Sequence, residues 1–96
     1  MHAVIRTYSG PNAKQLLDLL DRSKAEIEPL LRKVKGFVSY TLLRTGDGGI
    51  SFTVCQDKAG ADESVALARD WIQKNGATIG ARPPNVTEGS VILHLK

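Results

Sequence analysis

The chain has a single cysteine and no long apolar run. Cys55 cannot form a disulfide within the chain, and a zinc site built on several thiolates is excluded. The first residues lack the apolar stretch of a signal peptide, and no segment reaches the roughly 20 apolar residues that span a bilayer. A chain without disulfides suits a reducing compartment. We therefore expect a cytoplasmic protein that is not inserted in a membrane.

A concentrated basic surface is also missing. The 13 basic and 10 acidic residues give a formal net charge of +3, but no basic run is longer than Arg32-Lys33. Nucleic-acid-binding proteins usually gather Lys and Arg on one face, because each neutralised phosphate adds to affinity. The scattered charges therefore disfavour a nucleic acid as partner.

The overall composition is that of a globular protein. Hydrophobic residues make up 42% of the 96 residues and charged residues 24%, which excludes a disordered or fibrous chain. A chain of this length has room for one core, so we expect residues 1–96 to form a single domain.

Alternation of apolar and polar residues predicts four strands. A glycine-rich turn joins the two middle strands, and its glycines permit the positive φ angles of a hairpin. A loop over 77–85, which contains Pro83 and Pro84, precedes the last strand. The predicted strands cover residues 2–8, 37–44, 50–57 and 89–95.

Apolar residues at helical spacing predict two helices. The first begins after Asn12, which with Gln15 resembles a capping box, and ends at Gly36. Pro29 lies inside this helix, where proline removes a backbone hydrogen bond, so we expect one kinked helix rather than two helices. The second helix covers 60–75.

The register of the middle hairpin decides which side chains share a face. Pairing centred on Asp47 places Leu42 opposite Phe52 and Thr41 opposite Thr53. This register makes one face of the hairpin apolar and the other small and polar. A shift of one residue would turn the side chains of a strand to the opposite face.

The element order β-α-β-β-α-β predicts a ferredoxin-like α+β sandwich, with four antiparallel strands in the order 4-1-3-2 and both helices on one face. A mixed, partly apolar open face is normally covered, and two copies stacked through it would enclose a cavity. We therefore expect a homodimer formed through the open sheet face. The helix side is predicted to contain Ile5, Tyr40, Leu42, Phe52, Val54, Val91, Leu93 and Leu95. The open face is predicted to contain Val4, Arg6, Tyr8, Ser39, Thr41, Leu43, Ser51, Thr53, Cys55, Ile92 and His94.

A family resemblance rests on three features that together cover nearly the whole chain. They are the segment Gly36-Phe37-Val38-Ser39-Tyr40-Thr41-Leu42-Leu43-Arg44 after a long helix, a short hairpin, and an acidic, small-residue helix containing Trp71. These features resemble the dimeric α+β barrel proteins and, within them, the antibiotic biosynthesis monooxygenase-like family. That family includes oxygenases of aromatic polyketides, quinol oxygenases, haem-degrading enzymes and members without known activity. The resemblance implies a homodimer with a pocket for a small aromatic ligand.

The resemblance also bears on cofactors. Its haem-degrading branch has an Asn on the first strand and a His on the second helix. This chain has Arg6, Thr7 and Tyr8 on the first strand and no His on the second helix, so we expect neither haem nor another cofactor. Cofactor-free oxygenation, in which the substrate itself supplies electrons to O2, needs a base and a shielded pocket.

Arg6, Tyr8 and His94 are the candidate catalytic residues. Arg6 would bind an anionic substrate or stabilise an enolate, or alternatively pair with Asp57 or another carboxylate across the dimer. His94 would act as acid or base, or serve a structural role. His2 is expected beside it, but two imidazoles without a firm third ligand make a poor metal site, so we expect no metal.

The candidate pocket is predicted to use aromatic and small polar side chains. Tyr8 and Trp71 would stack on a flat ligand, although aromatics at such spacing are also common in cores, and Trp71 would equally suit a subunit contact. Cys55 would equally be a buried filler. The other predicted pocket residues are Ser39, Thr41 and Thr53.

Other function classes share this topology. A non-catalytic dimer would serve as a binding or stress-response accessory protein. RNA-recognition domains stack bases on aromatics of their first and third strands, but the predicted register places Phe52 on the helix side. Regulatory amino-acid-binding domains usually come attached to an enzyme, for which this chain has no spare residues.

Overall fold

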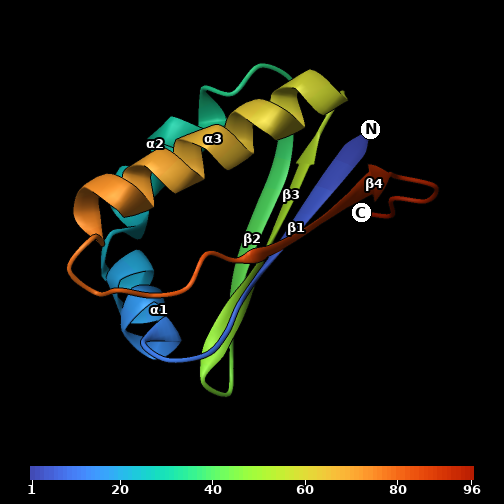
Figure 1. Ribbon diagram of the computed structural model, residues 1–96. Coiled ribbons are helices and arrows are strands. Elements are labelled where there is room, and N and C mark those ends of the chain that lie inside the picture. The colour runs from blue at the N-terminus through green and yellow to red at the C-terminus, as the bar shows by residue number, and fades with distance from the viewer.

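The computed structural model describes all 96 residues, which form one four-stranded antiparallel sheet covered by three helices on a single face (Figure 1). The strand order is β2-β3-β1-β4, so the predicted ferredoxin-like α+β class and strand order are confirmed. None of the helices is a candidate membrane span. The elements are β1 (His2–Tyr8), α1 (Ala13–Arg22), α2 (Lys24–Arg32), β2 (Phe37–Thr45), β3 (Gly48–Cys55), α3 (Lys58–Asn75) and β4 (Asn85–Ser90).

The predicted first helix is in fact two helices, and the break falls at Ser23 rather than at Pro29. Ser23 leaves helical geometry at φ −107° and ψ 8°, and its N–H donates to the carbonyls of Leu19 and Leu20. Serine is a poor helix former because its hydroxyl competes for backbone groups. The predicted capping box is also wrong, because Asn12 is left-handed at φ 68° and its side chain caps no N–H.

The predicted hairpin register is wrong by one residue. Thr45 lies opposite Gly48 and Thr41 opposite Phe52, so the centre falls between the two turn residues rather than on Asp47. Side chains alternate along a strand, so the shift turns β3 over, whereas Tyr40 and Leu42 of β2 lie on the helix side as predicted. Phe52 is 42% exposed on the open face, whereas the buried Thr53 faces the helices.

Close packing explains why two glycines that resemble turn residues belong to β3. A Cβ on Gly48 would collide with the carbonyl oxygen of Tyr8. A Cβ on Gly49 would lie 2.6 Å from Cδ1 of Leu17. No side chain fits at either position, so both glycines serve strand and helix packing, and the turn is only two residues long.

The first strand is also reversed with respect to the prediction. Val4, Arg6 and Tyr8 are buried against the helices, and Arg6 lies opposite Ser51 in the register of β1 and β3. The open face is uncharged throughout its strand positions. By the observed register it consists of Ala3, Ile5, Thr7, Ser39, Thr41, Leu43, Thr45, Ile50, Phe52, Val54, Asn85, Thr87 and Gly89.

The last strand ends earlier than predicted. β4 begins at Asn85, four residues before the predicted strand, and stops at Ser90, opposite His2. Beyond this point only Met1 remains as a pairing partner before β1. Its carbonyl accepts a hydrogen bond from the N–H of Val91. The residues after Val91 lie outside the sheet, and the side chain of Ile92 is almost fully exposed. The alternation of apolar and polar residues predicted a strand over the apolar residues 89–95, whereas β4 itself is more polar.

We predict that Thr53→Val stabilises the protein. The Thr53 hydroxyl is buried and has no hydrogen-bond partner, which costs about 1–3 kcal/mol, and valine has nearly the same shape. The free energy of unfolding in urea should rise by about 1 kcal/mol. Thr45→Val, at an exposed position, should change it by less than about 0.5 kcal/mol. A loss of stability on Thr53→Val would show that the hydroxyl is satisfied.

Candidate functional site

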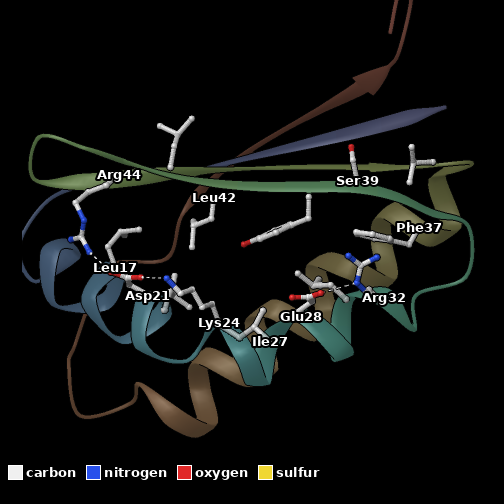
Figure 2. Close-up of a pocket in the computed structure, with 15 residues that line it drawn as sticks. Leu17, Asp21, Lys24, Ile27, Glu28, Arg32, Phe37, Ser39, Leu42 and Arg44 are labelled. Atoms are coloured by element: carbon white, nitrogen blue, oxygen red, sulfur yellow. Dashed lines mark hydrogen bonds and ion pairs between the residues drawn. The ribbon is translucent and has the colours of Figure 1, made fainter. Parts of the chain in front are cut away.

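A cavity of about 690 Å³ opens between the helices α1 and α2 and the edge strand β2 (Figure 2). Phe37 and Leu42 point from β2 into this outer cavity, and Ile27 reaches it from α2. The pocket is of the size that proteins use for small organic ligands. Its lining is mainly apolar, with charged side chains from α1, α2 and β2 around it.

The charged side chains of the outer cavity neutralise one another. Arg32 Nε lies 3.0 Å from Glu28 Oε1, and Lys24 Nζ lies 3.1 Å from Asp21 Oδ1 (Figure 2). Arg44 pairs at 2.9 Å with Asp18, whose pKa is lowered chiefly by its hydrogen bond from Lys14 and further by Arg44. The lining therefore carries charge but little net field.

A second, smaller cavity of about 30 Å³ lies deeper between the helices and the sheet. It shares four lining residues with the outer cavity: Leu20, Ile27, Leu31 and Tyr40. The walls of this inner cavity also include Arg6, Tyr8 and Trp71. Trp71 Nε1 donates to Glu26 Oε1 at 3.2 Å, which ties α3 to α2.

Arg6 is the unusual residue of the inner cavity. Its side chain projects from the middle of β1, the residue is 3% exposed, and its Nε donates to Ser51 Oγ at 3.0 Å. No carboxylate pairs with it, although burying a charge without a counter-ion is costly. A fixed positive charge in an apolar cavity is typical of a site that binds or stabilises an anion.

Two tyrosines complete the polar part of this cavity. Burial raises the pKa of both Tyr8 and Tyr40 above the ordinary value of 10.0, and the charge of Arg6 partly opposes the shift. Both phenols lie within reach of the Ser51 hydroxyl. At neutral pH they keep their protons and are hydrogen-bond donors as well as acceptors.

No family model and no curated protein matches the chain, but solved structures match it over nearly its whole length. A protein of unknown function from Nitrosomonas europaea is 20% identical, with a TM-score of 0.73, over 99% of this chain and 91% of its own. A monooxygenase from the ActVA-Orf6 gene of Streptomyces coelicolor, solved with nanaomycin D, is 15% identical, with a TM-score of 0.66, over 99% and 89%. The heme degrader MhuD of Mycobacterium tuberculosis, solved with two hemes, is 20% identical, with a TM-score of 0.67, over 100% of both chains. The chain has the fold of the dimeric α+β barrel proteins.

The resemblance seen in the sequence is thus confirmed as a shared dimeric α+β barrel fold, and identities of 15–20% show the fold alone. Three of the predicted site residues, Arg6, Tyr8 and Trp71, do lie together at the inner cavity. They do so on the helix side of the sheet, however, and not on the predicted open face.

The structure does not bring His94 to this site. It follows β4 and lines neither cavity. His2 does not pair with it, because His2 Nε2 makes a 2.8 Å hydrogen bond with Glu88 Oε1. Glu88 consequently has a lowered pKa, with Lys58 contributing in the same direction.

The small polar residues predicted for the pocket are dispersed in the structure. Ser39 borders the outer cavity, but its side chain points away from the helices (Figure 2). Thr41 is exposed on the open face. Thr53 and Cys55 are buried and line neither cavity, and burial raises the pKa of the Cys55 thiol.

Ser51 and Tyr40 were not predicted as site residues. Ser51 lies opposite Arg6 on the neighbouring strand, so the correct register alone would have found it. Phe52 lies on the open face rather than on the predicted helix side, so it does not by itself exclude an RNA-recognition domain. Phe52 is the one aromatic side chain at the strand positions of that face, and none of these positions is a cation that could bind a phosphate.

Haem, which one of the similar proteins binds, does not fit the residues present. Neither cavity is lined by a His, Cys or Met that could ligate the iron, and the two tyrosines hold their protons. No group of three or more His, Cys, Asp or Glu side chains is arranged to hold a metal ion.

We predict that both tyrosines ionise only above pH 10 in the folded protein. Below pH 10 the folded and unfolded states both hold these protons; above it the unfolded state loses them first, so the free energy of unfolding falls as pH rises. Tyr8 and Tyr40 are the only tyrosines, so phenolate absorbance reports on this site. The same titration in guanidinium chloride is the control. A half-titrated signal at pH 10 or below in the native protein would contradict the buried placement.

Proposed function

We propose that the protein is a homodimer that binds a small aromatic molecule in the outer and inner cavities and oxidises it with O2 without a cofactor. The observation that carries this proposal is Arg6, a buried cation without a carboxylate partner at the inner end of an apolar cavity. The monooxygenase of similar fold, solved with nanaomycin D, agrees with an aromatic ligand. Trp71 and Tyr40 supply flat surfaces for such a molecule.

Arg6 would act by stabilising the anion of the substrate. A phenol, or a C–H group beside a carbonyl, becomes more acidic when its conjugate anion meets a fixed guanidinium in a dry site. Tyr8 and Tyr40 would donate hydrogen bonds to the same oxygen, because they keep their protons. The electron-rich anion is then the species that reacts with O2.

The cavities contain no free base for this step. Asp21 and Glu28, the carboxylates of the outer cavity, are both paired with cations, and His94 lies elsewhere. The proton would therefore leave to water at the opening of the cavity. This requirement selects substrates that are already weak acids, since Arg6 supplies stabilisation of the anion but no group that removes the proton.

Anthrone is a suitable probe because its central CH2 group is acidic. After loss of a proton the carbon anion forms a C–O bond with O2, and the resulting peroxide loses water to give a C=O group. One oxygen atom enters the product and the other leaves as water, so O2 accepts all four electrons.

We predict that the protein consumes one O2 per anthrone and forms anthraquinone. Arg6→Gln should lower kcat by about 100-fold, the effect of losing one preorganised donor to an oxyanion. The kcat of Arg6→Lys should lie between those of the parent and Arg6→Gln. Arg22→Gln, at an exposed position on α1, should have the same kcat as the parent. Circular dichroism confirms that each variant is folded.

Quenching of Trp71, the only tryptophan, measures binding separately. Quenching by anthrone without O2 uptake would support the alternative, a non-catalytic binding protein. If anthrone causes neither quenching of Trp71 nor O2 uptake, the proposal of an aromatic ligand in these cavities is refuted.

The proposed homodimer forms through the open sheet face. Its strand positions carry no charge, and Leu43 and Phe52 leave large apolar side chains exposed there. A second copy presents the same face, so both apolar surfaces leave water together. The dimer would leave the helix-side cavities of each chain open.

We predict that light scattering gives twice the mass of one chain, and that Phe52→Arg halves it. A guanidinium at this position would be buried without a partner in the dimer. Gln15→Arg adds the same charge on the exposed surface of α1 and should leave the dimer intact. A monomeric parent protein would refute the dimer.

A further inference from the structure

A third cavity, of about 480 Å³, lies on the other side of Arg6, between α3, residues 76–86 and β4. Three arginines line it, Arg6, Arg69 and Arg82, and none of its 15 lining residues is acidic. We propose that this arginine cleft binds the carboxylate of a small, largely apolar organic acid. The proposal does not depend on the oxidation proposed above.

Arg6 links the cleft to the inner cavity. Both cavities are lined by Arg6, Tyr8 and Ile72, so the buried guanidinium is bordered by both. It is more than nine-tenths buried, its Nε donates to Ser51 Oγ, and no carboxylate neutralises it. A ligand carboxylate in the cleft would supply the missing counter-ion.

The two outer arginines add charge that the protein does not neutralise. Arg82 makes no ion pair, and Arg69 has only its neighbour Asp70 at 3.7 Å. The outer cavity differs in this respect, because its cations pair with carboxylates at 2.9–3.1 Å. The cleft therefore gathers three arginines without a carboxylate in its lining, whereas the cations of the outer cavity are paired.

The position of Arg82 is built into the turn that follows β1. The segment joining α3 to β4 passes this turn before it enters the sheet (Figure 1). A Cβ on Gly10, which has φ +85°, would lie 3.2 Å from Cδ of Arg82. Glycine thus serves both the left-handed turn and the close approach of the arginine side chain.

The remaining lining defines the ligand class. Leu16, Val65, Pro83 and other apolar residues form the walls, and Tyr8 offers a hydrogen-bond donor because burial raises its pKa. Planar guanidinium groups bind carboxylates through paired hydrogen bonds. An acid with an apolar body satisfies both the walls and the arginines, whereas inorganic phosphate satisfies only the charge.

Calorimetry with 2-naphthoate and its neutral analogue 2-naphthamide tests the proposal. Naphthoate should bind about tenfold more tightly than the amide, and Arg82→Gln or Arg69→Gln should each weaken it by about tenfold, as expected for losing a charge-assisted hydrogen bond. Arg22→Gln is the matched control and should bind as the parent does. Equal binding of naphthoate and naphthamide, or unchanged binding by both cleft variants, overturns the proposal.

Amide resonances of the folded protein locate the ligand. Naphthoate should shift the signals of Gly76, Gly80 and Ala81 in the cleft, and leave those of Lys24 and Ser39 at the outer cavity unchanged. Shifts confined to the outer cavity refute the cleft. Displacement of naphthoate by equimolar inorganic phosphate refutes a carboxylate site and indicates a site for charge alone.

The outcomes separate this site from the proposed oxygenase. Anthrone oxidation depends on Arg6, whereas Arg82→Gln should leave it within about twofold of the parent, because exposed charges at a distance are screened by salt. Loss of naphthoate binding with intact oxidation thus concerns the cleft alone. Absence of oxidation with intact naphthoate binding refutes only the oxygenase.

Discussion

The buried contact between Arg6 and Ser51 is the constraint on which the rest of the molecule depends. It joins the two central strands, β1 and β3, beneath the helices. A guanidinium keeps its charge in any environment, so a chain that buries one must surround it with polar groups or bind an anion beside it. The surroundings offer hydroxyl groups, including those of Tyr8 and Tyr40, and no carboxylate.

The sheet consequently has an unusual distribution of polarity. Its covered side carries a polar centre of Arg6, Ser51 and Thr53, whereas its open side exposes Leu43 and Phe52. Core packing alone would favour the reverse arrangement. The proposed chemistry on the helix side and the proposed association through the open side would account for both departures, and the two would not compete for the same surface.

The fold class could be predicted from the sequence because it depends on the existence and order of elements, which alternation and helical spacing report well. The site depends on single-residue register, which they report poorly. Gly48 and Gly49 resemble turn residues, yet packing against Tyr8 and Leu17 places them in β3. The resulting shift carried Ser51 to the wrong face in the prediction.

Composition was misleading in the same direction. Arg6 and the small polar residues of β3 have the hydropathy of an open face, so pattern alone placed them there, although they are buried beneath the helices. His94 was misplaced for another reason: the polar β4 ends at Ser90, where its partner strand has run out. Chemical type identified Arg6, Tyr8 and Trp71 as site residues, but only the register determines which cavity they share.

Because Arg6 borders two cavities, the two proposed ligands would be thermodynamically linked. An anion held on one side of the guanidinium neutralises the charge that an anion on the other side would use, so each lowers the affinity for the other. The factor is the same in both directions, because linkage is reciprocal. A single buried arginine would thereby give a chain of 96 residues the means to sense one small acid through its affinity for another.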